Sequence, residues 1–254
     1  MISLGALAER ALKVTKMGYK SLLLMVCLAM TGLVTPGASA DTKTYECFAQ
    51  PVTIFGTPGD DVLIGREDTA DVIVGLGGDD IIFGSEDINA STAPGDRLCG
   101  GSGDDYIRGG VGEDRIQGGS DKDDVDGGYG YDIITQGGDG DDRVADCDSE
   151  YTGGVRIIKG GSGVDRLCVD TDSTRMYGNG GGDLLIDLTC LDEARMYGGH
   201  GDDNFESYFD NLGGEECSDS SVDTSDRLVG GPGLDSAIIS PNDTTNEIEL
   251  VETR

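Results

Sequence analysis

The sequence has no tryptophan, one histidine and 18 basic residues among 254. A nucleic-acid-binding protein of the usual kind is excluded, because it needs a basic surface to meet phosphates. A bundle of membrane-spanning helices is excluded as well, since the sequence has no apolar run of about 20 residues. A single histidine and the absence of a C-x-x-C pair leave no basis for a zinc or copper site.

Glycine and acidic residues are abundant instead. The chain has 43 glycines and 49 acidic residues, a formal net charge of −31 and a hydrophobic fraction of 37%. A conventional single core is hard to build from such a composition, because glycine and aspartate fill too many positions. Two classes of chain fit: an acidic disordered segment, or a repeat fold whose charge is neutralised by bound cations.

Residues 1–40 differ from the rest of the chain. Four basic residues precede an apolar stretch at 21–34, and Ala38 and Ala40 form an A-x-A pattern. This layout predicts a secretory signal peptide that is cleaved after Ala40. An uncleaved anchor is the alternative, but the apolar stretch is short for a membrane-spanning helix. We therefore expect a secreted, extracellular protein with no membrane span after cleavage.

The predicted mature chain carries 14 basic and 48 acidic residues, a charge of −34, after loss of four basic residues and Glu9. It retains six cysteines, and an even number in an exported chain predicts disulfides rather than reduced buried thiols. The sequence does not choose among the possible pairings, although Cys147, Cys168 and Cys190 recur at similar intervals, about one turn of the repeat structure described below. The six are Cys47, Cys99, Cys147, Cys168, Cys190 and Cys217.

The sequence repeats with a period of nine. From residue 100 it reads GGSGDDYIR, GGVGEDRIQ, GGSDKDDVD and GGYGYDIIT, then Gln136 as an extra residue, then GGDGDDRVA. Seven six-residue stretches match G-G-x-G-x-D without a mismatch. A large apolar residue follows each aspartate at the second place and is expected to point inward. These inward residues are Leu63, Ile82, Ile107, Ile116, Val125, Ile134, Val144, Leu167, Leu185 and Phe205, with Ala237 as a weaker last member.

Elementary chemistry explains the pattern. A three-residue strand alternates in orientation, so its middle residue points inward. Glycines allow a turn whose backbone angles other residues avoid, and they leave carbonyl oxygens accessible. A carboxylate at the end of the turn adds an anionic oxygen, and calcium prefers six to eight oxygen ligands of these kinds. The repeat therefore predicts calcium binding between stacked turns.

The blocks resemble the repeats-in-toxin (RTX) calcium-binding nonapeptide family over roughly residues 56–238. The resemblance implies an all-β fold, a right-handed parallel β-roll (a β-solenoid) with coils of about 18 residues and calcium-binding Gly/Asp turns. It also implies that the sixth residue of each block ligates calcium. These residues are Asp61, Asp80, Asp105, Asp114, Asp123, Asp132, Asp142, Asp165, Asp183, Asp203 and Asp235, and the spacing of 18 adds Asp96.

Two blocks make one coil, so residues 18 apart stack on one edge of the roll. Asp96, Asp114 and Asp132 should share one edge, and Asp105, Asp123 and Asp142 the other. The predicted organisation is a signal peptide (1–40), an N-terminal cap (41–55), the repeats (56–238) with insertions at 85–95, 146–159 and 207–225, and a C-terminal cap (239–254). In segments 169–177 and 187–197 one edge should carry a longer, metal-free loop.

The sequence predicts a non-catalytic, structural or calcium-responsive module that folds when it binds several calcium ions. It contains no H-E-x-x-H or G-x-S-x-G motif, and one histidine gives no triad. The open alternatives are a flexible acidic spacer, a hydrolase with paired carboxylates, and an adhesin-like protein that binds a cell-surface or glycan partner on the outer face of the roll. An anionic polysaccharide is disfavoured by the charge of −34 unless calcium bridges the two.

Overall fold

The structure, a computed structural model, describes residues 46–85, 94–130, 132, 134–146, 157–169, 174–188, 194–207, 226–239 and 244–253. These residues lie within one compact unit, residues 44–254. The predicted signal peptide and Cys147, Cys190 and Cys217 fall outside the described residues. Within the described ranges, no helix has the length and apolar character needed to span a membrane.

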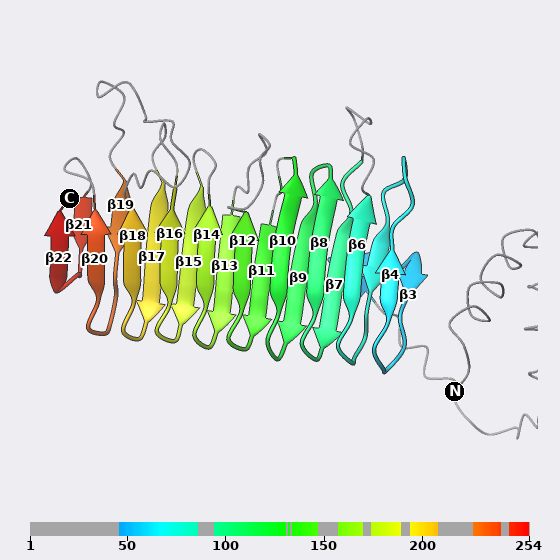
Figure 1. The fold of residues 1–254 in the computed structure, drawn as a ribbon, viewed down its shortest axis with the longest axis horizontal. Helices are drawn as coiled ribbons and strands as arrows, with labels where there is room; N and C mark the ends of the chain where they lie inside the picture. The colour runs from blue at the N-terminus through cyan, green and yellow to red at the C-terminus, as the bar shows by residue number, and fades with distance from the viewer. Residues whose placement is uncertain are drawn as a thin grey trace, which may run out of the picture. The chain divides into compact units, whose positions relative to one another are not determined.

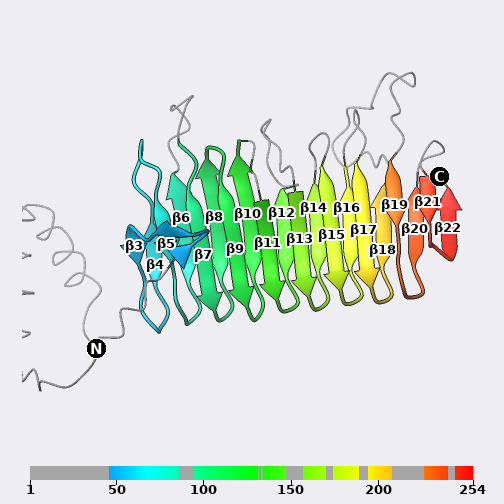
Figure 2. The same cartoon turned by 180° about the vertical axis from the view of Figure 1, so that it is seen from behind.

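Two ten-stranded parallel sheets make up the roll, and successive strands alternate between them (Figures 1 and 2). The even sheet contains β4 (Val62–Ile64), β6 (Ile81–Ser85), β8 (Tyr106–Val111), β10 (Asp124–Tyr129), β12 (Arg143–Asp146), β14 (Arg166–Val169), β16 (Leu184–Asp187), β18 (Asn204–Ser207), β20 (Ser236–Ile239) and β22 (Leu250–Thr253). The odd sheet contains β3 (Ile54–Phe55), β5 (Val72–Val74), β7 (Arg97–Ser102), β9 (Arg115–Ser120), β11 (Ile134–Asp139), β13 (Ile157–Ser162), β15 (Arg175–Gly180), β17 (Arg195–His200), β19 (Arg227–Val229) and β21 (Thr244–Asn246). The predicted all-β parallel roll is confirmed.

The inward residues of the two sheets form one continuous core. Ile107 of β8 lies in register with Ile82 of β6 and Val125 of β10, and all three are fully buried. The odd sheet contributes a matching row that includes Leu98 and Ile116. Each block thus contributes one large apolar residue, and the core is only two side chains thick, one from each sheet.

The second glycine of a block is required by the backbone. Gly161 has φ of +139°, a left-handed value, and a Cβ placed there would overlap the carbonyl of Gly138 on the neighbouring coil. A side chain at this position would therefore be strained in its own backbone and would also force the coils apart.

The register of β11 differs from the register predicted for Ile134. The strand pairing aligns Ile134 with Arg115, and Thr135 with the buried Ile116 and Ile158. Gln136 keeps the regular position opposite Gln117, so the extra residue of this coil precedes Ile134. The repeat pattern in the sequence could not locate the extra residue. A residue added just before a strand and one added just after it give similar nine-residue blocks.

A hairpin of β1 (Glu46–Cys47) and β2 (Gln50–Pro51) precedes the first coil. Cys47 forms a disulfide with Cys99 of β7, and it packs in a small cluster with Val72 and Val74 of β5. This cluster explains why β5 is buried on both faces. Cys168 is also disulfide-bonded.

The two sheets run further than the predicted repeat boundaries. β3 pairs with β5 at one end, and β21 and β22 pair with β19 and β20 at the other. The pairing is possible because backbone hydrogen bonds need no Gly/Asp turn, and Glu249 takes the place of the block aspartate before β22.

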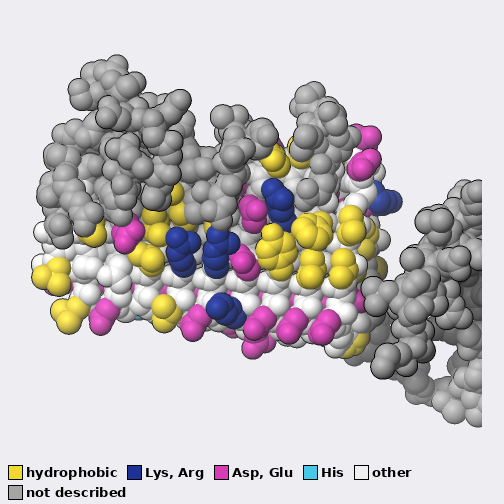
Figure 3. Space-filling model, viewed as in Figure 1, with side chains coloured by type: hydrophobic (Ala, Val, Ile, Leu, Met, Phe, Trp, Pro, Cys, Tyr) yellow, Lys and Arg dark blue, Asp and Glu magenta, His cyan; other side chains and the backbone are white. Residues whose placement is uncertain are grey.

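The outer face of the even sheet is apolar at its N-terminal end. Val62, Ile64, Ile81 and Tyr106 are all exposed there, and the ring of Phe83 meets that of Tyr106 edge to face. Figure 3 shows these hydrophobic side chains gathered over the first strands of this face. Outward positions in this part of the roll are therefore not simply polar.

Candidate calcium site

The block aspartates form a ladder along the edge that precedes the even strands. The backbone N–H of each aspartate donates a hydrogen bond to Oδ1 of the aspartate one coil further on, over 2.8–3.0 Å. We call this row the long ladder; it consists of Asp61, Asp80, Asp105, Asp123, Asp142, Asp165, Asp183, Asp203 and Asp235, and it ends where Asp235 donates to Glu249.

A second row, the short ladder, lies on the opposite edge before the odd strands. The N–H groups of Asp71, Asp96 and Asp114 donate to Oδ1 of the next member, over 2.6–2.8 Å, and Asp132 is the last acceptor. The spacing of 18 residues thus placed Asp96, Asp114 and Asp132 on one edge and Asp105, Asp123 and Asp142 on the other, as expected.

We call inner those carboxylates that follow the first member of each ladder, and all of them except Asp96 have one oxygen without a hydrogen-bond partner. These side chains are at most 2% exposed, so bulk solvent does not reach the unpaired oxygen. A buried carboxylate oxygen with no donor is costly, and a row of them calls for a cation. The buried Oδ2 atoms without a hydrogen-bond partner include those of Asp80, Asp105, Asp114, Asp123, Asp132, Asp142, Asp165, Asp183, Asp203 and Asp235.

The first glycine of each block keeps space for these oxygens. Gly118 does not have a left-handed φ, so its backbone does not demand glycine. A Cβ on Gly118 would, however, overlap Oδ2 of Asp123 and lie 2.7 Å from the carbonyl oxygen of Gly137 on the next coil. Carboxylate and carbonyl oxygens of neighbouring coils therefore converge where a side chain would stand.

This donor set suits a hard cation. Among the described residues, no group of three or more His, Cys, Asp or Glu side chains is placed to hold a metal ion. A bound ion must therefore combine carboxylates of neighbouring coils with backbone carbonyls. Calcium accepts such a mixed shell of oxygens, whereas zinc prefers nitrogen and sulfur.

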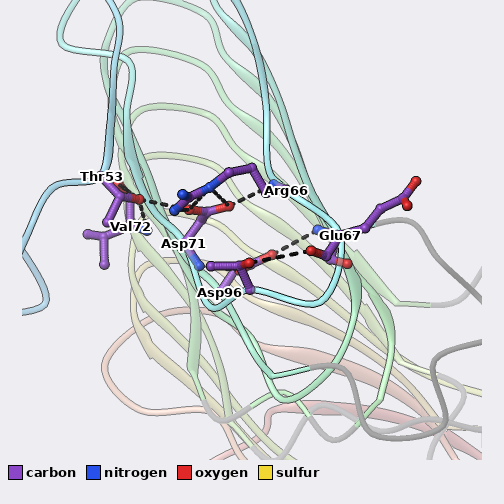
Figure 4. A network of polar contacts seen from close by, with 8 residues as sticks. Thr53, Arg66, Glu67, Asp71, Val72 and Asp96 are labelled. Atoms are coloured by element: carbon purple, nitrogen blue, oxygen red, sulfur yellow. Dashed lines mark hydrogen bonds and ion pairs between the residues drawn. The ribbon is translucent and has the colours of Figure 1, made fainter.

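Asp71, the first member of the short ladder, shows how a positive charge supplied by the protein itself affects a buried carboxylate. Arg66 donates to both carboxylate oxygens of Asp71 through its backbone and its guanidinium, and Thr53 donates from the other side (Figure 4). Burial alone would raise the pKa of Asp71, but these hydrogen bonds and the charge of Arg66 hold it below its ordinary value. A guanidinium thus neutralises this carboxylate, as a metal ion would.

The inner ladder aspartates have no such partner, and their pKa values move the opposite way. Burial, with repulsion from neighbouring carboxylates, raises the pKa of Asp114 and Asp123 to about 8. The pKa rises to about 7 for Asp132 and Asp165, and to about 6 for Asp105 and Asp203. Burial also raises the pKa of Asp80, Asp96, Asp142, Asp183 and Asp235.

Two predicted residues differ from the inner ones. Asp61 begins the long ladder and is partly exposed, and its Oδ2 accepts hydrogen bonds from the backbone and hydroxyl of Thr57. Oδ2 of Asp96 accepts the N–H of Ser85 over 2.8 Å. Both carboxylates therefore have fewer free lone pairs than their neighbours in the ladders.

Sequence reasoning missed three ladder positions. Asp71 is not among the predicted ligands, and Glu249 falls within the predicted C-terminal cap. Asp226 is buried and accepts the N–H of Ala194 and the hydroxyl of Ser207. The signal for Asp226 was present, because Asp-Arg-Leu at 226–228 repeats the same tripeptide at 96–98 and 165–167.

The short ladder is interrupted where a metal-free loop was expected. Thr174 and Ala194 precede β15 and β17 and accept, through their carbonyls, hydrogen bonds of the kind that Asp71 and Asp96 accept elsewhere. Neither residue offers a carboxylate. The long ladder continues past them through Asp183 and Asp203.

The fifth residue of several blocks is also acidic but lies outside the ladders. Asp104 and Asp141 are exposed, and their Oδ1 atoms accept the N–H groups of Lys122 and Val164 on the next coil. Because these carboxylates reach solvent, water can hydrate them without a bound cation.

Fold and ladders together define a class of protein: a parallel β-roll with buried carboxylates along its turns that suit oxygen-bound cations. The family model of the RTX calcium-binding nonapeptide repeat matches four copies, at residues 53–69 and 100–134. These two segments thus match RTX calcium-binding repeats, and Ca²⁺ is the ion that such repeats imply. No curated protein matches the chain in sequence.

The raised pKa values predict how the calcium-free roll depends on pH. A carboxyl whose pKa is higher in the folded state stabilises folding fully below its unfolded value, near 3.8, and that contribution is lost as the pH rises through the folded value. The calcium-free chain should therefore keep strand structure near pH 5 and lose it between about pH 6 and 8. Far-ultraviolet circular dichroism from pH 5 to 9 measures this. Loss of structure towards acid, with stability at pH 8, would contradict the assignment.

Proposed function

We propose that this chain is a secreted protein in which the two aspartate ladders bind several calcium ions, and that this binding folds the roll into a structural or calcium-responsive module. The single observation that carries the proposal is the row of buried Oδ2 atoms without partners. The contrast with Asp71 supports it, since that carboxylate has Arg66 beside it and keeps a low pKa.

The proposed ligands are the twelve aspartates predicted from the repeats. The inner members other than Asp96 are the strongest candidates, because each offers a buried oxygen without a hydrogen-bond partner. A Cβ on the first glycine of the block would meet both this oxygen and a glycine carbonyl oxygen of the next coil in the blocks of Asp80, Asp105, Asp114, Asp123 and Asp183. Asp61 and Asp96 are proposed as weaker contributors at positions where protein donors already take one oxygen.

We propose no catalytic role for the ladders. A raised carboxyl pKa at one isolated place often marks a general acid. Here the raised values recur from coil to coil, which favours a repeated ion site over a single reaction centre. Turnover of a peptide or glycan by the calcium-loaded chain would contradict this part of the proposal.

The proposal is tested on the exported chain. After cleavage, mass spectrometry should find a chain that begins at Asp41, and calorimetric titration of it with CaCl₂ at pH 7.5 should show more than one ion bound. MgCl₂ serves as the control and should bind far more weakly, because Mg²⁺ demands near-octahedral geometry and gives up its water reluctantly. Absence of calcium binding would overturn the proposal, and an unprocessed N-terminus would remove its secretory part.

A further inference from the structure

The charges of this acidic chain are distributed unevenly over its surface. The strands of the odd sheet from β7 to β19 carry five arginines and one lysine, against one acidic residue, Asp139 at the end of β11. The predicted mature chain has 14 basic residues against 48 acidic ones. The outer face of one sheet is therefore basic although the whole chain is strongly negative.

Three of these arginines stand directly beside one another. Arg175, Arg195 and Arg227 occupy the same register position on β15, β17 and β19, which are neighbours in the odd sheet (Figure 2). All three are exposed. Adjacent strands are about 4.8 Å apart, so the three positive charges form a straight row along the roll.

No acidic side chain offsets this row within the part of the chain that the structure describes. The ion pairs of the described residues involve Arg66, Arg108 and Arg143. Like charges placed directly opposite each other on a sheet are destabilising. The row therefore costs the fold some stability, and an anionic ligand would relieve that cost.

The rest of this face is suited to a sugar chain. Tyr177 and Tyr197 lie two residues beyond Arg175 and Arg195 on the same strands, and their rings stack with centroids 5.0 Å apart. An open groove of about 490 Å³ crosses β9, β11, β13 and β15 and is lined by three glycines and by polar residues. The polar residues are Gln117, Gln136, Asp139, Lys159, Ser162 and Asn179.

We infer that the outer face of the odd sheet binds a linear polysaccharide that carries carboxylate or sulfate groups. Its anionic groups would meet Arg175, Arg195 and Arg227, since the planar guanidinium pairs well with both oxyanions. Its hydroxyls would meet the polar residues of the groove. A linear ligand is indicated because the three arginines repeat along one line, and Gln117, Gln136, Lys159 and Tyr177 repeat along a parallel line two residues further on.

Charge complementarity favours an acidic polysaccharide over nucleic acid. The turns beside this face carry exposed carboxylates such as Asp104 and Asp141. These repel a densely charged phosphate backbone, whereas a sugar chain with widely spaced anionic groups can be held by the row alone. The net charge of the chain, taken by itself, disfavours such a partner. Our proposal departs from that expectation because the structure places the positive charges of this face together.

This inference rests on the proposed function, because the row exists when calcium has folded the roll. The test measures binding to hyaluronan, chondroitin sulfate, dextran and a single-stranded DNA oligonucleotide by calorimetry in saturating CaCl₂, with circular dichroism to verify the fold. The wild-type chain is compared with the triple variant R175Q/R195Q/R227Q. The matched control is R108Q/R143Q/R166Q, which removes the same charge from the outer face of the even sheet.

We expect hyaluronan, chondroitin sulfate or both to bind, dextran not to bind, and the odd-sheet variant to lose about tenfold or more in affinity while the control changes less than about threefold. The odd-sheet variant should be at least as stable as the wild type, which a merely structural role for the arginines would not allow. Overturning results are a folded chain that binds no anionic polysaccharide, equal binding by the odd-sheet variant, equal binding of dextran, or tighter binding of the oligonucleotide. If calcium fails to fold the chain, the calcium proposal fails and this inference fails with it.

Discussion

Residues 41–254 in a chelating buffer at pH 7.5 are expected to show little strand structure by circular dichroism, and addition of excess calcium should produce the full β-signal. The disulfide between Cys47 and Cys99 is kept oxidised in both samples. The circular dichroism signal without calcium should be that of a mostly unfolded chain. This loss of structure is the largest effect that the ladders predict.

The physical reason is the buried row of carboxylates. At pH 7.5 the folded chain without cations must either protonate these groups, at a cost, or leave several negative charges close together and away from water. Each calcium ion that binds the folded state alone contributes about 2.7 kcal/mol at a hundredfold excess over its dissociation constant. Under the proposed function, several such ions would decide whether a roll with so narrow a core is folded.

Magnesium chloride at the same concentration is the control and should leave most of the chain unfolded. A complete strand signal in the chelator at pH 7.5 would contradict the coupling of folding to calcium. The same result would mean that interactions within the protein alone stabilise the ladders. The unpaired carboxylate oxygens would then not require a bound cation.

Replacement of Asp142 by asparagine should raise the calcium concentration at the midpoint of folding by about 10- to 100-fold, the usual size of the effect when a metal site is damaged. Asparagine keeps an oxygen that can accept the N–H of Asp123. It replaces the free Oδ2 by an amide NH₂, which is a donor and cannot ligate a cation. The backbone ladder is thus retained while the proposed ligand atom is lost.

The neighbouring residue supplies the matched control. Asp141→Asn makes the same change of charge one position earlier, but Asp141 is exposed and accepts the N–H of Val164 outside the ladder. Its calcium midpoint should move by less than about twofold, because exposed charges contribute little. Equal shifts in the two variants, measured by calcium titration with circular dichroism, would show that net charge rather than a specific site controls folding.

Much of the site could be predicted from the repeat itself. The nonapeptide period placed Asp114 and Asp123 on opposite edges, because two blocks return the chain to the same place in a parallel roll. Where the period breaks, prediction was weaker. Asp226 was missed because a long insertion precedes it, and Ile134 was misplaced because an extra residue shifts the register by one.

The sequence by itself determined the parallel β-roll, its row of inward apolar residues and the identity of most ladder aspartates, because these follow from a short local pattern repeated many times. Tertiary structure decided which carboxylate oxygen is left without a donor, that Arg66 neutralises Asp71, and that Arg175, Arg195 and Arg227 form one basic row. Each of these depends on which residues meet between coils. Insertions of different lengths determine which residues of neighbouring coils are in register. Only the hydrogen-bonded stack of strands brings these partners together.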